Sequence, residues 1–102
     1  MFLVEIFLPT FDNEGQRFSK AAFEAVRREL TDKFGGVTAF TRAPATGLWS
    51  DDAGHLHRDE LAIFEVMSDA LDRAWWTGYR QDLERRFRQE EIVVRATQSE
   101  RI

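Results

Sequence analysis

The chain has 102 residues, of which 43% are hydrophobic and 31% charged, proportions typical of one globular domain with one core. Its formal net charge of −4 disfavours a nucleic-acid-binding protein, because such a protein needs a basic face to displace phosphate counterions. The absence of cysteine excludes disulfides, zinc–thiolate sites and cysteine nucleophiles. No apolar run approaches the roughly 18 residues that would suggest a membrane span. We therefore expect a single cytoplasmic domain over residues 1–102.

The first predicted element is a strand at residues 2–8, FLVEIFL, which is rich in aromatic and aliphatic residues. Pro9 ends the strand, because proline has no N–H to donate to a neighbouring strand. Glu5 interrupts the apolar run and no basic segment precedes it, so this stretch is predicted to be a strand and not a signal peptide. The turn-forming residues at 12–15 predict a loop after it.

A helix is predicted from the N-cap residue Ser19 to the glycine pair Gly35-Gly36. Phe18 and Phe23 flank the predicted cap with the spacing of a hydrophobic staple. Glycine ends the helix because it adopts the left-handed conformation at little cost. The apolar residues of the helix fall on one stripe: Phe23, Val26, Leu30 and Phe34.

Two strands, a second helix and a final strand are predicted after the glycine pair. Pro44 and Gly47 indicate a turn between the two strands. Ser68 or Asp69 is the expected N-cap of the second helix, which carries an apolar residue at every fourth position. The predicted ranges are 37–43 and 60–67 for the two strands, 70–88 for the helix and 91–96 for the final strand.

This order of elements, β-α-β-β-α-β, predicts a ferredoxin-like fold of the α+β class. Right-handed crossovers then give a four-stranded antiparallel sheet with both helices on one face. With the strands numbered along the chain, the expected spatial order is 4-1-3-2. The fold therefore leaves one face of the sheet without helices, here called the bare face.

The strands predicted at residues 2–8 and 60–67 are apolar on both faces. A strand with one face in water should instead alternate between apolar and polar residues. In the first strand, Leu3 and Phe7 fall on the bare face. Two helices can cover only one face, so we expect a second copy of the chain to cover the other as a homodimer with two-fold symmetry.

The element order and the two-faced apolar pattern resemble the dimeric α+β barrel superfamily, in which two ferredoxin-like subunits pack sheet against sheet. The resemblance covers residues 2–96, and the segments FLVEIFLP, DELAIFEVM and AWWTGYR are also similar to small uncharacterised bacterial proteins. The superfamily includes cofactor-free monooxygenases, haem-degrading enzymes, isomerases and ligand binders. Haem-degrading members carry an Asn on the first strand, a Trp on the third and a His on the second helix. The corresponding stretches here have none of these, so haem chemistry is not expected.

The candidate catalytic residues are Glu5, Glu65 and Arg95, which the strand alternation places on the bare face. Two neighbouring carboxylates in a half-dry environment repel each other, which raises one pKa unless a cation intervenes. A carboxyl group with a raised pKa can act as a general acid or base. The same three residues also suit a structural ion-pair network at a dimer interface. Arg42, on the strand predicted at 37–43, is a further candidate for ligand binding.

The adjacent residues Trp75 and Trp76 point about 100° apart on a helix. Trp75 falls in line with Leu71 and Tyr79 and is predicted to lie in the core. Trp76 is predicted at the edge of that stripe. There it would either line a ligand pocket between the second helix and the sheet or cap the core.

His55 and His57 lie in the polar connection at residues 47–60. The H-x-H spacing on an extended segment places both rings on one side, which suits metal ligation. Nothing in the sequence fixes a third ligand, so a polar hairpin tip is the favoured interpretation and no metal or other cofactor is expected. Trp49, in the same connection, needs an apolar contact to cover it.

The sequence favours a homodimer with a small-molecule-binding or structural role. The alternative is a cofactor-free small enzyme, similar to a monooxygenase or an isomerase, that acts on an apolar or aromatic ligand. An apolar cavity between the sheet and the helices, with Trp76 or the two acids in its wall, would favour the enzyme. RNA-recognition motifs share the element order, but the segment DELAIFEVM lacks their basic-glycine-aromatic pattern.

Overall fold

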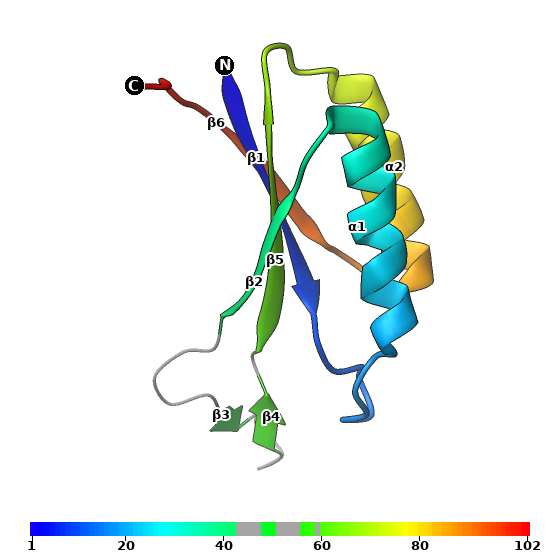
Figure 1. Ribbon diagram of the computed structural model, residues 1–102. Helices are drawn as coiled ribbons and strands as arrows, with labels where there is room; N and C mark the ends of the chain where they lie inside the picture. Colours follow the sequence, from blue (N-terminus) through cyan, green and yellow to red (C-terminus); the bar gives the residue numbers. More distant parts are fainter. Residues whose placement is uncertain (43–47, 51–55, 59) are drawn as a thin grey trace.

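Two helices lie side by side on one face of a four-stranded antiparallel sheet (Figure 1). The computed structural model describes residues 1–42, 48–50, 56–58 and 60–102. The sheet contains β1 (Phe2–Pro9), β2 (Thr38–Arg42), β5 (Leu61–Ser68) and β6 (Val93–Gln98), and the helices are α1 (Lys20–Phe34) and α2 (Arg73–Arg86). The spatial order β2-β5-β1-β6 confirms the predicted ferredoxin-like fold and the predicted order 4-1-3-2. Neither helix in the described part of the chain has the length and apolar character needed to span a bilayer.

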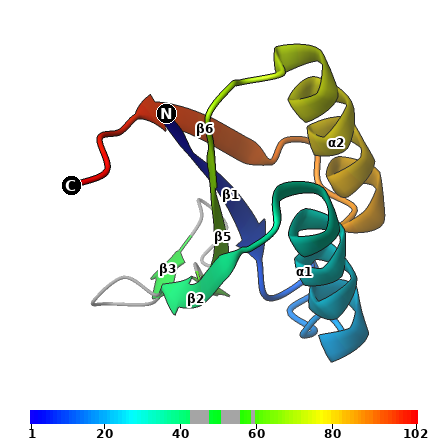
Figure 2. The same cartoon turned by 45° about the horizontal axis from the view of Figure 1, so that its top comes forward.

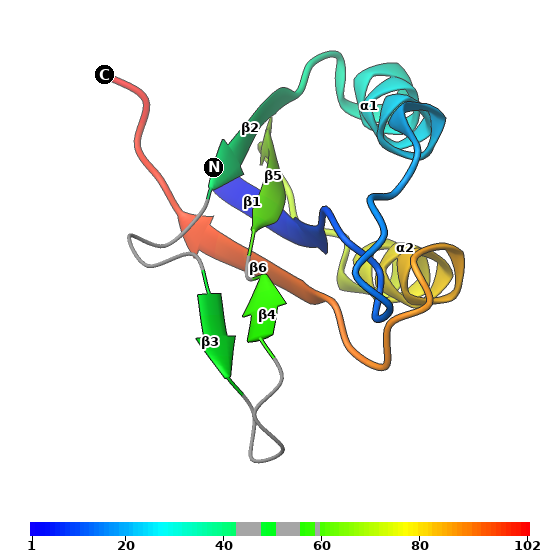
Figure 3. The same ribbon diagram turned by 90° about the horizontal axis from the view of Figure 1, so that it is seen from below.

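The connection between β2 and β5 carries a small sheet of its own, which consists of β3 (Leu48–Ser50) and β4 (Leu56–Arg58). Figures 1 and 3 show this two-stranded sheet beyond the ends of β2 and β5. Trp49 of β3 is paired with His57 of β4. The sequence predicted a polar connection here but not these strands, because three residues are too few to show an alternating pattern. The apolar contact expected for Trp49 lies outside what the structure describes.

Helix α1 has the start and the end that the sequence predicts. The Oγ atom of Ser19 accepts a hydrogen bond from the N–H of Ala22 at 3.2 Å. At the other end, Gly35 adopts a φ of 83° and donates its N–H to the carbonyl of Thr31 at 2.8 Å. Local capping signals thus fix both ends of the helix. Its apolar stripe faces the sheet, with Val26 and Leu30 buried.

Helix α2 begins later than predicted, and neither Ser68 nor Asp69 is its N-cap. Asp72 is the N-cap, and its Oδ1 atom accepts a hydrogen bond from the N–H of Trp75 at 3.1 Å. Ser68 remains in β5, where it is paired with Phe2 of β1. The prediction was wrong because sheet pairing extends the strand through the first capping residue, and a second good N-cap follows four positions later.

Glu84 determines how the chain passes from α2 into β6. Its Oε2 atom accepts hydrogen bonds from the N–H of Ile92 at 3.0 Å and from Nη1 of Arg80 at 2.8 Å. The bond from Ile92, followed by the pairing with Arg80, lowers the pKa of Glu84. Because this N–H is bound to a side chain, β6 begins at Val93, two residues after the predicted start. Arg88, with a φ of 51°, follows α2, which ends two residues before the prediction.

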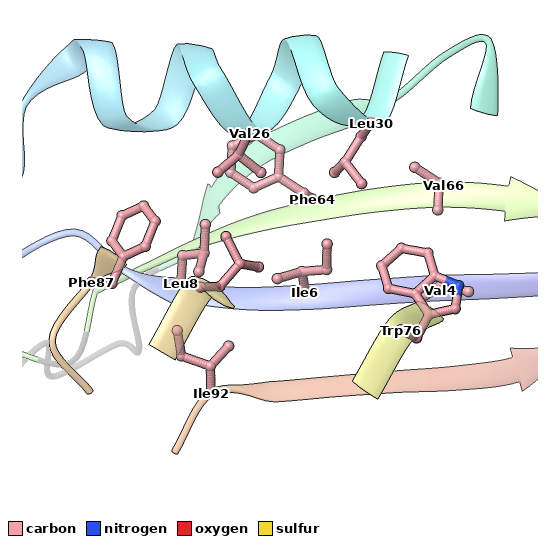
Figure 4. Packing of buried hydrophobic residues seen from close by; sticks show 11 residues of the cluster. Val4, Ile6, Leu8, Val26, Leu30, Phe64, Val66, Trp76, Phe87 and Ile92 are labelled. Carbon is pink, nitrogen blue, oxygen red and sulfur yellow. The ribbon is translucent and has the colours of Figure 1, made fainter. Parts of the chain in front are cut away.

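The core lies between the sheet and the helices (Figure 4). Trp76 belongs to it, with an exposed fraction of 6%, and its ring stacks on Phe34 at a centroid distance of 5.2 Å. Trp75 is only partly buried and stacks on Tyr79, so the prediction that Trp75 is the tryptophan in the centre of the core was wrong. The reason is that Trp76 and Leu83, seven positions apart, form the face turned to the sheet. The buried cluster consists of Val4, Ile6, Leu8, Val26, Leu30, Phe64, Val66, Trp76, Leu83, Phe87 and Ile92.

Replacing Gly35 by alanine should lower the free energy of unfolding by about 1 kcal/mol, because an L side chain disfavours a positive φ. A Cβ atom at Gly35 would meet nothing within 4 Å, so backbone strain alone is tested. Gly36→Ala is the matched control, because Gly36 has the same open space without a positive φ. Urea denaturation of both variants measures the difference. Equal stabilities would contradict the assignment of Gly35 as the left-handed cap.

Candidate functional site

Side chains on the bare face form rows that cross the strands, and one of these rows carries the candidate acids. Thr38 of β2 is paired with Glu65 of β5, Glu65 with Glu5 of β1, and Glu5 with Arg95 of β6. Paired residues in an antiparallel sheet point to the same face, so the four side chains lie together. We call this set the acid row. Figure 2 shows that the helices stand on the opposite side of the sheet.

Apolar rows lie on both sides of the acid row. The pairing of the strands places Phe40, Ile63, Phe7 and Val93 in one row and Met67, Leu3 and Thr97 in the other. The two acids are therefore held on the bare face among large apolar side chains, as the alternation in β1, β5 and β6 predicts.

Arg95 neutralises Glu5. Its Nε atom donates a hydrogen bond to Oε1 of Glu5 at 2.9 Å, and the side chain of Glu5 is 14% exposed. The guanidinium group of Arg95 also lies over the ring of Phe7, 4.8 Å from its centroid. A planar cation held by a carboxylate and an aromatic ring has little freedom to move. Glu5 and Arg95 therefore form a fixed ion pair within the row.

Glu65 lies directly across from Glu5 on the neighbouring strand. Burial raises the pKa of Glu65, and the charge of Glu5 and hydrogen bonding between the two carboxyl groups raise it further. Like charges on directly opposed residues of a sheet repel each other, so Glu65 keeps its proton to a higher pH than an isolated glutamate. The acid row thus contains a carboxylate paired with an arginine and a second carboxyl group whose raised pKa suits it to proton transfer.

Arg42 lies on the bare face but away from the acid row. It is paired with Leu61, and four residues along β2 separate it from Thr38. At about 3.3 Å per residue, this separation is about 13 Å. The structure therefore does not bring Arg42 to the acids.

Trp76 lines a pocket of about 230 Å³ between α2 and β6, here called the α2–β6 pocket. Figure 4 shows Trp76 beside Val4 of β1, which lines the same pocket. Arg73, Thr77 and Arg80 supply polar groups from α2, and Arg95, whose guanidinium group is bound to Glu5 on the bare face, borders the pocket from β6. The three α2 residues are not among the candidates predicted from the sequence. Their spacing of four and three positions, which places them on one helix face, was the available signal.

The two histidines are not assembled into a metal site in what the structure describes. His55 lies outside the described residues, and His57 is part of β4. Among the described residues, no three or more His, Asp or Glu side chains are grouped so that they could hold a metal ion.

The chain matches no protein-family model, and no curated protein shows significant sequence similarity to it. The fold is of the ferredoxin-like α+β class, and two solved structures of a phage SAM lyase share it. The complex with S-methyl-5′-thioadenosine has a TM-score of 0.62 and 15% identity, and the match covers 94% of this chain and 79% of the lyase chain. The apo form has a TM-score of 0.60 and 16% identity, and that match covers 94% and 78% of the two chains. At such identity the likeness establishes the fold alone.

Replacing Glu65 by glutamine should stabilise the protein at pH 7 by about 0.2–1 kcal/mol, the usual size of a cross-strand charge effect. Because folding raises the pKa of Glu65, the folded chain binds this proton more tightly than the unfolded chain. The wild type therefore loses stability as the pH rises from the ordinary glutamate pKa of 4.5 through the raised pKa of Glu65, and the glutamine variant does not.

Urea denaturation of both proteins at pH 4 and pH 7, at one protein concentration, measures this difference. The variant should have the higher free energy of unfolding at pH 7, and the two proteins should be nearly equal at pH 4. Glu90→Gln, at an exposed position, is the control and should show no such trend. A glutamine variant that is no more stable than the wild type at pH 7 would contradict repulsion within the acid row.

Proposed function

We propose that this protein is a small enzyme that acts on a small molecule at the bare face, with Glu65 as its acid–base group. The observation that carries this proposal is the acid row itself. Glu65 is opposite a carboxylate that Arg95 holds in place, and apolar rows flank the pair. The structural comparison also supports the proposal, because a SAM lyase that was solved with S-methyl-5′-thioadenosine shares the fold.

The charge of the acid row favours a cationic substrate. The row contains two carboxyl groups and one guanidinium group, so its net charge is −1 when both acids are ionised. Arg95 is bound to Glu5, so the acid row has no second arginine that could pair with Glu65. A positive group of the substrate would therefore be attracted to Glu65. S-adenosylmethionine carries such a group, a sulfonium, and is the first substrate to test.

We also propose that a second copy of the chain covers the bare face, as in the dimeric α+β barrel superfamily. Phe40, Met67 and Val93 are exposed by 42%, 45% and 51% on this face. Ile63, between Phe7 and Phe40, is only 1% exposed, so the chain itself already covers part of the face. A partner copy would then bury the remaining apolar side chains and exclude water from Glu65.

The dimer can be tested by placing an aspartate at Met67 or at Val93, two exposed positions on different strands of the bare face. Each variant should be a monomer by light scattering at micromolar concentration, because a charge would be buried in the interface. Circular dichroism checks that the fold is kept. Ala21→Asp, at an exposed position of α1, is the control and should stay dimeric. A monomeric wild type would overturn the proposed dimer.

The enzymatic role can be tested by incubating the protein with S-adenosylmethionine and measuring S-methyl-5′-thioadenosine by chromatography. Glu65→Gln should lower the rate about 100-fold or more, the usual contribution of a general acid or base. Glu90→Gln should keep the wild-type rate. An undiminished rate in a folded Glu65→Gln variant would remove Glu65 from the mechanism, and no conversion by the wild type would exclude this substrate.

A further inference from the structure

The α2–β6 pocket brings together two arginines of one helix. Arg73 and Arg80 line it from α2, whereas Arg95 borders it from β6 with its guanidinium group turned to Glu5 on the bare face. The remaining wall is mostly apolar and includes Val4 and Val94. This pocket lies between the helix and the edge strand, whereas Glu65 lies on the bare face of the sheet.

Arg80 is held in place by a carboxylate. Nη1 of Arg80 donates to Oε2 of Glu84 at 2.8 Å, and Glu84 in turn accepts a hydrogen bond from the N–H of Ile92. A guanidinium group has five N–H donors, so this bond leaves Arg80 with donors for another acceptor.

Arg73 differs from Arg80. Within the described part of the chain, it makes no ion pair and no hydrogen bond through its side chain, and it is exposed at the mouth of the pocket. The nearby carboxylate of Asp72 accepts the N–H of Trp75 at the start of α2. The pocket therefore has a positive charge that no carboxylate of the described residues offsets by direct contact.

Trp76 contributes a rigid apolar part of the pocket wall. Its ring is stacked on Phe34, with 9° between the ring planes, and meets Trp75 edge-on at 4.8 Å. Only 6% of the residue is exposed, so the indole is held in one position by its neighbours. The part of the ring that reaches the pocket favours an apolar group beside it.

We propose that the α2–β6 pocket binds a small organic anion, a carboxylate or phosphate attached to an apolar group. Arg73 and Arg80 would bind the anionic oxygens, because guanidinium forks match both acid groups. The volume of about 230 Å³ lies below the roughly 300 Å³ at which sites for drug-sized ligands begin. The ligand is therefore about the size of benzoate or phenyl phosphate.

The experiment is a titration of the full-length protein with benzoate and with phenyl phosphate, followed by NMR of the tryptophan indole N–H groups. Trp76→Phe identifies the signal of Trp76. At least one of the two anions should shift this signal to saturation, and benzyl alcohol, of similar size without the charge, should not. Saturation by one anion alone identifies the acid group that the pocket prefers.

Arg73→Ala should raise the Kd of the bound anion about tenfold, the usual effect of losing a charged hydrogen bond. Arg80→Lys, which keeps the positive charge beside Glu84 but loses the fork, should also weaken binding. Arg85→Ala is the matched control, because Arg85 is exposed on the same helix, contacts Asp82 and does not line the pocket.

Three results would overturn the proposal: no saturable shift with either anion, an unchanged Kd in Arg73→Ala, or equal binding of benzyl alcohol. The proposal does not depend on the acid–base role of Glu65. Glu65→Gln should bind the anion as the wild type does, so failure of one proposal is distinguishable from failure of the other.

Discussion

The pairing of β1 with β5 and β6 is the constraint on which both the core and the acid row depend. Successive side chains of a strand point to opposite faces, so a single register buries Val4 and Ile6 under the helices and places Glu5 on the bare face. A shift of one residue would bury the carboxylate of Glu5 in the core and expose Ile6. The energy of the apolar core therefore also holds Glu5 opposite Glu65 against the repulsion between their charges.

Charge balance within the acid row favours a functional role over a purely structural one. In an ion-pair network that only fixed a dimer interface, each carboxylate would be expected to have its own cation. Arg95 is bound to Glu5, whereas Glu65 faces Glu5 and has a raised pKa. Locally destabilising interactions of this kind are typical of functional sites, where the stability of the rest of the fold offsets them.

The sequence predicts this fold well where the signals are local and less well where they depend on tertiary contacts. Ser19 and Gly35 are capping signals that need no partner, and the alternation in β1 and β5 places Glu5 and Glu65 correctly. The N-cap of α2 is Asp72 and not Ser68, because Ser68 is paired with Phe2 of β1. The spacing of apolar residues within α2 likewise does not determine which tryptophan is the more buried, because that depends on how the helix packs on the sheet. The distance of Arg42 from the acids likewise depends on how β2 is aligned with β5, which no pattern within β2 reveals.

The edge strand β6 contributes to both candidate sites from its two faces. Successive residues of a strand point to opposite faces, so Val94 and Ala96 line the α2–β6 pocket whereas Arg95 pairs with Glu5 on the bare face. The hydrogen bond from the N–H of Ile92 to Glu84 joins the start of this strand to α2. Because β6 pairs with β1 along one edge only, its alignment with β1 places residues in both candidate sites at once.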